Sequence, residues 1–294
     1  MKIIARTLIA VALLCGPASG QTADPLLLVD VDWLSQHLSD RDVVVLHVGT
    51  RTEYNAQHIP GARFVSRDEV AKPQDAARGD LTLELPAATD LRTTFAARGV
   101  SDDSRIVVYL GKDSDVQQAT RIILTLDYLG LGNRTSLLNG GLGAWLRAGK
   151  PVTAEAPRAT PGVLSARATK PVVVDAEFVK SLASRQNHKL IDARAPVFYT
   201  GVQPTNNKAG HIPGAANIPF TDVVDTELKM DRGRLAELFA RAGVRPGDTV
   251  VAYCHIGSQA TVVVFAARLL GHPVVLYDGS FQDWATANRG PVEK

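Results

Sequence analysis

The sequence is built from two related halves, and this internal repeat constrains the fold more than any other feature. Four segments recur in the same order: HIPGA at 58–62 and 211–215, FAARGV at 95–100 and FARAGV at 239–244, RIVVYL at 105–110 and TVVAYC at 249–254, and LNGGLGAW at 138–145 and YDGSFQDW at 277–284. The repeating unit is far longer than the roughly 20–50 residues of a solenoid repeat. The sequence therefore predicts the duplication of a whole domain.

Each half alternates short apolar runs with helical stretches, which is typical of parallel sheets covered by helices. We therefore predict an α/β fold of two tandem domains, each a mainly parallel sheet with helices on both faces. The chain of 294 residues suits two domains at about 150 residues each. We place the first domain at 24–150, a linker rich in proline at 151–171 and the second domain at 172–294. In the second half we expect strands at Lys189–Asp192, Thr249–Tyr253 and Val274–Tyr277, and helices at Ala176–Ser184, Arg232–Ala242 and Ala260–Leu270.

The first 20 residues have the pattern of a secretory signal peptide. Lys2 and Arg6 are basic, residues 8–15 are apolar, and small residues precede a predicted cut between Gly20 and Gln21. The apolar run is too short to span a bilayer, and no later run is long enough either. We expect a periplasmic or secreted protein that has no membrane segment after cleavage.

Composition and charge exclude several classes of protein. The chain is 45% hydrophobic and 21% charged, which excludes fibrous and disordered proteins, and its net charge of +2 indicates no nucleic-acid partner. Removal of the signal peptide reduces 32 basic residues to 30, equal to the 30 acidic residues. It also removes Cys15 and leaves Cys254 alone, which excludes an internal disulfide and a cysteine zinc site.

Cys254 lies where a thiolate would be stabilised. It follows a predicted strand that ends at Tyr253, and a short loop leads from it into an apolar helix. Ligands of open parallel sheets bind beyond the carboxyl ends of the strands, and a helix N-terminus favours negative charge. Such surroundings lower the pKa of a cysteine, and Gly257 permits a sharp turn. The alternative is a cysteine buried as a small apolar residue.

The repeat provides an internal comparison for this cysteine. Leu110 stands at its position in the first half, so only the second half can perform thiolate chemistry. Nine steps separate Leu110 from Ala119, whereas six separate Cys254 from Ala260, which predicts a longer loop in the first half.

These segments together resemble the tandem-domain rhodaneses, a family of sulfurtransferases. The resemblance rests on the two HIPGA segments, the strand, cysteine, loop and helix around Cys254, the DAR sequence at 192–194 and the closing YDGSFQDW. It covers essentially all of the chain after the signal peptide. It implies an inactive first domain and a catalytic second one.

The resemblance implies a two-step sulfur transfer through a persulfide on Cys254. The donor is thiosulfate or 3-mercaptopyruvate, and the acceptor is cyanide or a thiol, which includes a periplasmic thiol protein. The persulfide is bound by the loop residues His255, Ile256, Gly257, Ser258 and Gln259, without a metal or an organic cofactor. The alternative is a persulfide carrier or protein-binding rhodanese module without turnover.

Cysteine phosphatases use a similar loop, but they need an arginine six residues after the cysteine. Ala260 occupies that position, so phosphoryl transfer is not expected.

The chain departs from the family around the donor site. Its loop reads CHIGSQ instead of the CRKGVT or CGSGVT typical of the two specificities, and the donor-binding arginines fall on Phe198 and near Asn207. His255 is either a substitute cation or an exposed loop residue. Asp192 is expected to support the loop from behind, and Arg194 is either a donor ligand or a structural residue.

The remaining polar and aromatic candidates favour structural roles. Lys208 is expected at the surface unless it reaches the pocket mouth. His211 has a counterpart in the inactive half, His58, so it is expected to hold a turn. Trp145 and Trp284 are likewise equivalent, which indicates packing.

Overall fold

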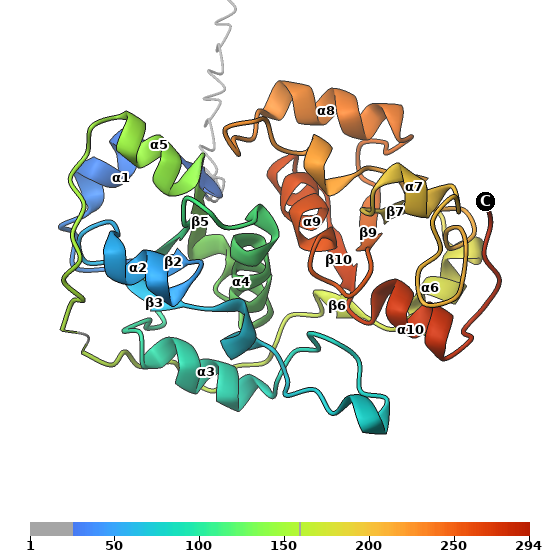
Figure 1. The fold of residues 1–294 in the computed structure, drawn as a ribbon, viewed down its shortest axis with the longest axis horizontal. Helices are drawn as coiled ribbons and strands as arrows, with labels where there is room; N and C mark the ends of the chain where they lie inside the picture. Colours follow the sequence, from blue (N-terminus) through green and yellow to red (C-terminus); the bar gives the residue numbers. More distant parts are fainter. Residues whose placement is uncertain (1–25, 159) are drawn as a thin grey trace, which may run out of the picture.

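The computed structural model describes residues 26–158 and 160–294, so the predicted signal peptide and its cleavage point lie outside the described residues. Two α/β domains lie side by side (Figure 1). The first contains β1 (Leu28–Val29), α1 (Val31–His37), β2 (Val43–Val48), α2 (Arg51–Ala56), β3 (Arg63–Val65), α3 (Ala88–Ala96), β4 (Arg105–Leu110), α4 (Val116–Tyr128), β5 (Thr135–Leu138) and α5 (Gly141–Arg147).

The second domain repeats this order of elements. It contains β6 (Val173–Val174), α6 (Ala176–Ser181), β7 (His188–Asp192), α7 (Pro196–Tyr199), β8 (Ala216–Asn217), α8 (Arg232–Arg241), β9 (Thr249–Tyr253), α9 (Ala260–Leu269), β10 (Val274–Tyr277) and α10 (Ser280–Thr286). The expected strands and helices of this half are confirmed to within one residue, except that a 3-10 turn, Leu182–Ser184, ends the first helix.

Each domain has a five-stranded parallel sheet, and the two strand orders are the same. They are β1-β5-β4-β2-β3 and β6-β10-β9-β7-β8. Matching aspartates begin the first helix of each domain: Asp30 accepts a hydrogen bond from Trp33 N, and Asp175 accepts one from Phe178 N. The predicted α/β fold with duplicated parallel sheets is confirmed.

Alternation along the central strands divides their side chains between two apolar layers. In β9, Val251 and Tyr253 pack with α6 and α10, whereas Val250 and Ala252 face the layer that contains α9. That second layer continues through the contact between α9 and α4 into the first domain, so one apolar core joins the two domains.

The two HIPGA segments fold in the same way. His58 stacks on Tyr54 with ring centroids 3.9 Å apart, and His211 stacks on Tyr199 at 3.8 Å. Each histidine also forms an antiparallel bridge with the chain that follows its domain, at Thr153 and at Glu293. The expected turn-holding role of His211 fits these contacts.

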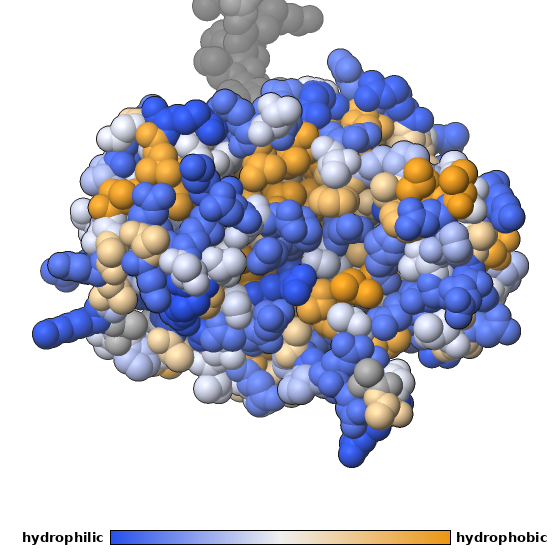
Figure 2. Space-filling model, in the orientation of Figure 1, coloured by the Kyte–Doolittle hydropathy of each residue, from blue (hydrophilic) through white to orange (hydrophobic). Residues whose placement is uncertain are grey.

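Residues 151–171, predicted to be a linker, run along the first domain. Gly162 N donates to Ala96 O at 2.8 Å, and Lys170 N donates to Tyr128 O at 2.9 Å. Hydrophilic side chains cover most of the face shown in Figure 2, and apolar patches lie both where the domains meet and on the outer part of each domain. A cleft of about 390 Å³ opens between the domains, lined by residues between 114 and 117 and between 220 and 228.

Candidate active site

Cys254 is the first residue after β9, and its backbone is fixed by the start of α10. Cys254 N donates to Ser280 Oγ at 3.2 Å, and its carbonyl accepts from Phe281 N at 3.0 Å. The side chain is a free thiol, fully buried, in the same apolar layer as Ala252. Cys254 is therefore buried among apolar residues, as one sequence interpretation expected. It also lies at the carboxyl edge of the sheet, as the thiolate interpretation expected.

Residues 254–259, named here the cysteine loop, connect β9 to the ten-residue helix α9. Gly257 has φ +77°, and a Cβ there would lie 2.5 Å from the carbonyl oxygen of Asp278. The loop therefore requires glycine at this point for both conformation and space. Ile256 is half-buried and Ser258 is buried. Ser258 Oγ and the Oε1 of Gln259 are buried without a hydrogen-bond partner in the described part of the chain.

The first domain supports the cysteine loop through a buried arginine of α4. Arg121 Nη1 donates to Gly257 O at 3.1 Å and to Asp278 Oδ1 at 2.5 Å, and Nη2 donates to the carbonyl of Leu83. Asp278 in turn accepts from Leu85 N at 3.2 Å. The loop that carries the cysteine is therefore anchored to a helix and a segment of the other domain.

A second contact between the domains lies at the start of α9. Thr120 Oγ1 and Thr261 Oγ1 are 2.6 Å apart, and Thr261 Oγ1 donates to Ser258 O at 2.7 Å. Both ends of the turn after Gly257 are thus held by side chains at the interface.

Asp192 and Arg194 form a fully buried ion pair behind the loop. Arg194 Nη2 donates to Asp192 Oδ2 at 2.6 Å and to Gly210 O at 2.8 Å, and its guanidinium stacks 3.9 Å from the ring centroid of Phe281. Burial lowers the pKa of Arg194, but the bonds from Asp192 outweigh it and raise the pKa above its usual range. Because Phe281 N binds Cys254 O, the pair supports the cysteine from beneath. These contacts favour the structural interpretation of Arg194.

His255 is partly buried, which excludes the exposed-loop alternative. Its ring stands perpendicular to Phe198 with centroids 4.6 Å apart, and Nδ1 lies 3.4 Å from Thr205 Oγ1. Burial, together with the positive charge of Arg194, lowers the pKa of His255 to about 4 against the opposing effect of Asp192. The imidazole is therefore neutral at pH 7, and the expectation of a substitute cation is not supported.

Residues 111–115, named here the counterpart loop, connect β4 to α4 in the first domain. Tyr109 and Tyr253 each accept a hydrogen bond from the isoleucine of a HIPGA segment at 3.0 Å, so Leu110 and Cys254 are structurally equivalent. The prediction of a longer loop in the first half is wrong. The extra residues before Ala119 belong to α4, which already begins at Val116.

The counterpart loop binds a carboxylate. Glu53 of α2 accepts hydrogen bonds from Lys112 N and, at 3.2 Å, from Asp113 N, and Ser114 Oγ lies 3.4 Å from it. A Cβ on Gly111 would lie 2.2 Å from this carboxylate. The same turn between strand and helix thus binds an anion through its backbone in the domain without a cysteine.

The other candidates lie away from the cysteine loop. Lys208 Nζ donates to Asn288 Oδ1 at 2.8 Å and to Gly290 O at 3.2 Å, so it is not directed to a pocket mouth at the loop. Trp145 and Trp284 each donate to a proline carbonyl, of Pro151 and Pro291. The packing role expected for both tryptophans fits these contacts.

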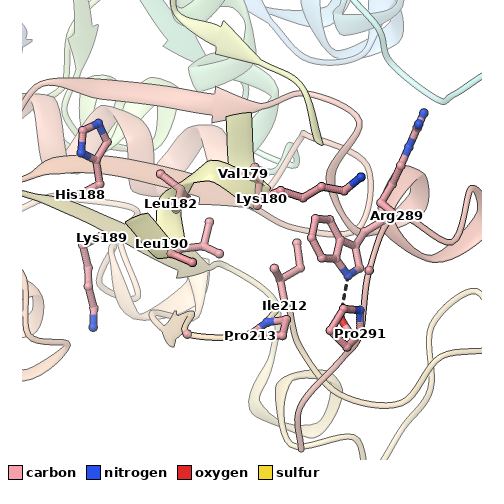
Figure 3. A pocket seen from close by; sticks show the side chains of 14 residues that line it. Val179, Lys180, Leu182, His188, Lys189, Leu190, Ile212, Pro213, Arg289 and Pro291 are labelled. Atoms are coloured by element: carbon pink, nitrogen blue, oxygen red, sulfur yellow. Dashed lines mark hydrogen bonds between the residues drawn. The ribbon is translucent and has the colours of Figure 1, made fainter. Parts of the chain in front are cut away.

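A cavity of about 620 Å³ lies on the α6 and α10 side of the second sheet and contains no residue of the cysteine loop. Figure 3 shows Leu190 and Ile212 beside this space, whereas Lys189 points away from it. Among the described residues there is no cluster of three or more potential metal ligands and no helix long and apolar enough to cross a membrane.

Comparison with known proteins identifies the family and the fold. The sequence profile of the rhodanese-like domain matches residues 30–148 and 175–287. The chain belongs to the rhodanese family.

Among its rhodanese relatives, thiosulfate sulfurtransferase of Rattus norvegicus is 30% identical over 94% of this chain and 89% of its own length. A probable 3-mercaptopyruvate sulfurtransferase of Pseudomonas aeruginosa is 34% identical over 90% of this chain and 97% of its own length. The crystal structure of SseA from Escherichia coli, described as a 3-mercaptopyruvate sulfotransferase, matches with a TM-score of 0.74 at 27% identity, covering 86% of this chain and 98% of that one.

Sequence reasoning missed Arg121, which binds the cysteine loop, and Glu53, which binds the counterpart loop. Arg121 is a charged residue in the largely apolar run of α4, and a charge at a buried helix position is a signal that a partner exists. Glu53 carried no comparable signal, because its partners are more than 50 residues away in the chain.

Proposed function

We propose that the chain is a sulfurtransferase in which Cys254 transfers a sulfane sulfur from a small donor to a thiophilic acceptor. The observation that carries the proposal is the position of Cys254, which begins the turn between β9 and α9, while Leu110 stands at the same place in the first domain. The relatives named as thiosulfate and 3-mercaptopyruvate sulfurtransferases support the same reaction.

The transfer has two steps. The Cys254 thiolate attacks the outer sulfur of thiosulfate or the single sulfur of 3-mercaptopyruvate. The bond from that sulfur to the rest of the donor breaks, and its electron pair leaves with sulfite or with the enolate of pyruvate, which is then protonated to pyruvate. A cyanide or thiolate acceptor then attacks the outer sulfur of the persulfide and releases the Cys254 thiolate. No oxidant, metal or organic cofactor is required.

The chain's own residues stabilise the negative sulfur in this scheme. Backbone N–H groups of residues 255–259, at the N-terminus of α9, bind the terminal persulfide sulfur as an oxyanion hole binds oxygen. The carboxylate held by the counterpart loop supports this role, because that turn binds an anion through its N–H groups. Arg121, Asp192 and Arg194 hold the loop and the start of α10 in place.

We also propose export of the protein through its first 20 residues, with a periplasmic or secreted location and a periplasmic thiol protein among its acceptors. The basic n-region, apolar h-region and small residues before Gln21 support this proposal. N-terminal sequencing of the protein from fractionated cells tests it, with Gln21 expected as the first residue.

The reaction is tested with thiosulfate and cyanide, scored by thiocyanate, and with 3-mercaptopyruvate, scored by pyruvate. We expect turnover with at least one donor, a gain of one sulfur atom on Cys254 by mass spectrometry, and the loss of both in Cys254→Ser. Leu110→Met at the equivalent position is the matched control and should retain activity, because this exchange conserves volume. Turnover that survives in Cys254→Ser contradicts the assignment, and stoichiometric loading without turnover indicates a persulfide carrier.

A further inference from the structure

Two side chains contact His255 on the outer side of the cysteine loop: the Thr205 hydroxyl, 3.4 Å from Nδ1, and the apolar ring of Phe198. Phe198 of α7 presents its ring to His255, with centroids 4.6 Å apart. Two exposed valines share this segment: Val197 is 43% exposed and Val202 is 79% exposed. Gln203 N donates to Val197 O at 2.8 Å and closes them into one turn. Phe198 therefore borders the cysteine loop, and the two exposed valines lie in the same turn as Phe198.

The first domain shows that a side chain at the position of Phe198 reaches this kind of loop. Phe198 precedes Tyr199, which stacks on His211, and Glu53 precedes Tyr54, which stacks on His58. Glu53 therefore occupies the position equivalent to Phe198, and its carboxylate binds the counterpart loop. The residue before the stacked tyrosine therefore determines whether a charged or an apolar side chain contacts the loop between strand and helix in each domain.

The cations that contact the elements of the site are already paired. Arg194 is bound by Asp192, and Arg121 is bound by Asp278. His255 is neutral at pH 7, because burial lowers its pKa to about 4. A donor that approaches past Phe198 therefore meets apolar surface and a neutral ring. Beside Phe198 a dianion would give up hydration without gaining an ion pair with a side chain, whereas an apolar substituent would gain contact area.

We propose that Phe198 determines the choice of donor, and that the site prefers organic sulfane-sulfur donors with an apolar substituent and a single negative charge over dianionic thiosulfate. This inference rests on the proposed sulfur transfer through Cys254 and specifies its substrate class. The simplest probe is benzenethiosulfonate, in which a phenyl group replaces one oxygen of thiosulfate.

Benzenethiosulfonate would load Cys254 by transferring its outer sulfur. The Cys254 thiolate attacks the outer sulfur, a sulfur–sulfur bond forms, and the bond from that sulfur to the sulfonyl sulfur breaks. The electron pair leaves with benzenesulfinate, no proton moves, and Cys254 is left as a persulfide anion.

The experiment measures kcat/KM for benzenethiosulfonate and for thiosulfate at a fixed cyanide concentration, and compares the ratio between variants. We expect the wild-type ratio to favour benzenethiosulfonate. Phe198→Arg should lower this ratio by about tenfold or more, because it exchanges an apolar contact for a charge-assisted bond to the dianion. Phe198→Leu should preserve the preference. Val163→Arg is the matched control, since it adds the same charge at a site 74% exposed in the linker and should leave the ratio unchanged.

Loading of Cys254 is followed by mass spectrometry in the same samples. If Cys254 is loaded by either donor but Phe198→Arg leaves the ratio at the wild-type value, the specificity inference is overturned and the proposed function stands. A wild-type preference for thiosulfate also overturns the inference. If neither of these donors loads Cys254 but 3-mercaptopyruvate does, the specificity inference fails and the proposed function stands. If none of the three donors loads Cys254, both proposals fail.

Discussion

The two domains place different groups in the same turn between strand and helix, and the difference is larger than the presence or absence of a cysteine. In the second domain the turn carries Cys254 and faces Phe198. In the first domain Leu110 replaces the cysteine, and Glu53 fills the turn with its carboxylate. The domain without Cys254 therefore retains a turn that binds an anion, and its own Glu53 side chain provides that anion.

A second difference lies beneath the turn. His47 of β2 occupies the place of Asp192 in β7, and its Nδ1 lies 2.9 Å from Tyr109 Oη. The second domain instead contains the Asp192–Arg194 pair next to the equivalent Tyr253. The domain that contains Cys254 thus has a buried ion pair where the other domain has the imidazole ring of His47.

Breaking the Asp192–Arg194 pair should have the largest effect on stability. Arg194→Met leaves the fully buried Asp192 without its partner, so we expect the free energy of unfolding to fall by about 3–5 kcal/mol. Urea denaturation measures this change. Arg105→Met removes two solvent-accessible ion pairs, to Asp40 and Asp42, and should cost about 0–1 kcal/mol for each. Equal losses in the two variants would show that the buried pair is not the main support of the second domain.

Arg121→Met tests whether the first domain positions the cysteine loop. Loss of the bonds to Gly257 and Asp278 should lower kcat/KM by up to about 100-fold, because small displacements of reacting groups have large effects on rate. Arg121→Lys should restore part of the activity, since it can still bind Asp278. Steady-state kinetics on folded protein, checked by circular dichroism, provides the measurement. Full activity in the methionine variant would contradict a positioning role.

Glu53→Ala should empty the counterpart loop without affecting catalysis. The loss of charge-assisted hydrogen bonds should lower the free energy of unfolding by about 1–3 kcal/mol. Added sulfate should restore part of this loss by binding the freed N–H groups, while kcat stays near the wild-type value. Glu237→Ala, at an exposed pair with Arg241, is the control and should show no sulfate-dependent recovery. No difference between the two variants in sulfate would refute an anion-binding counterpart loop.

Acid should weaken the two domains through one histidine in each. Burial is the main cause that lowers the pKa of His47 and of His255 from 6.5 to about 4. The unfolded chain therefore binds more protons between these values, so stability is complete above about pH 6.5 and decreases as the pH falls towards 4. We expect each histidine to contribute a loss on the order of 1–2 kcal/mol at pH 5. His255→Asn should flatten the dependence of thermal unfolding on pH, and an unchanged slope would show that the ring is protonated in the folded state.

The fold could be predicted from the sequence, because the same order of apolar runs occurs in both halves and each half supports the strands expected in the other. Thr249–Tyr253 is a continuous apolar strand, and its counterpart Arg105–Leu110 has the same pattern, so each predicts the other. The position of Cys254 at the end of that strand follows directly from its boundary.

The partners of the loops could not be predicted, because they depend on how distant segments pack. The bond from Arg121 to Gly257 joins residues 136 apart across the domain interface, and Glu53 reaches the counterpart loop from a different helix. Periodicity describes which face of an element is buried, but not which element of another domain covers it. The burial of His255, which decides its charge, has the same origin.

The contact between α4 and α9 has a consequence for the half of the chain that lacks a nucleophile. Arg121 and Thr120 lie on a helix of the first domain, yet they hold the turn that carries Cys254. A mutational screen for lost sulfur transfer should therefore reveal sensitive positions in a domain that performs no chemistry, concentrated on one face of α4. The first domain, which lacks the cysteine, thus contributes the side chains that hold the cysteine loop of the second domain in place.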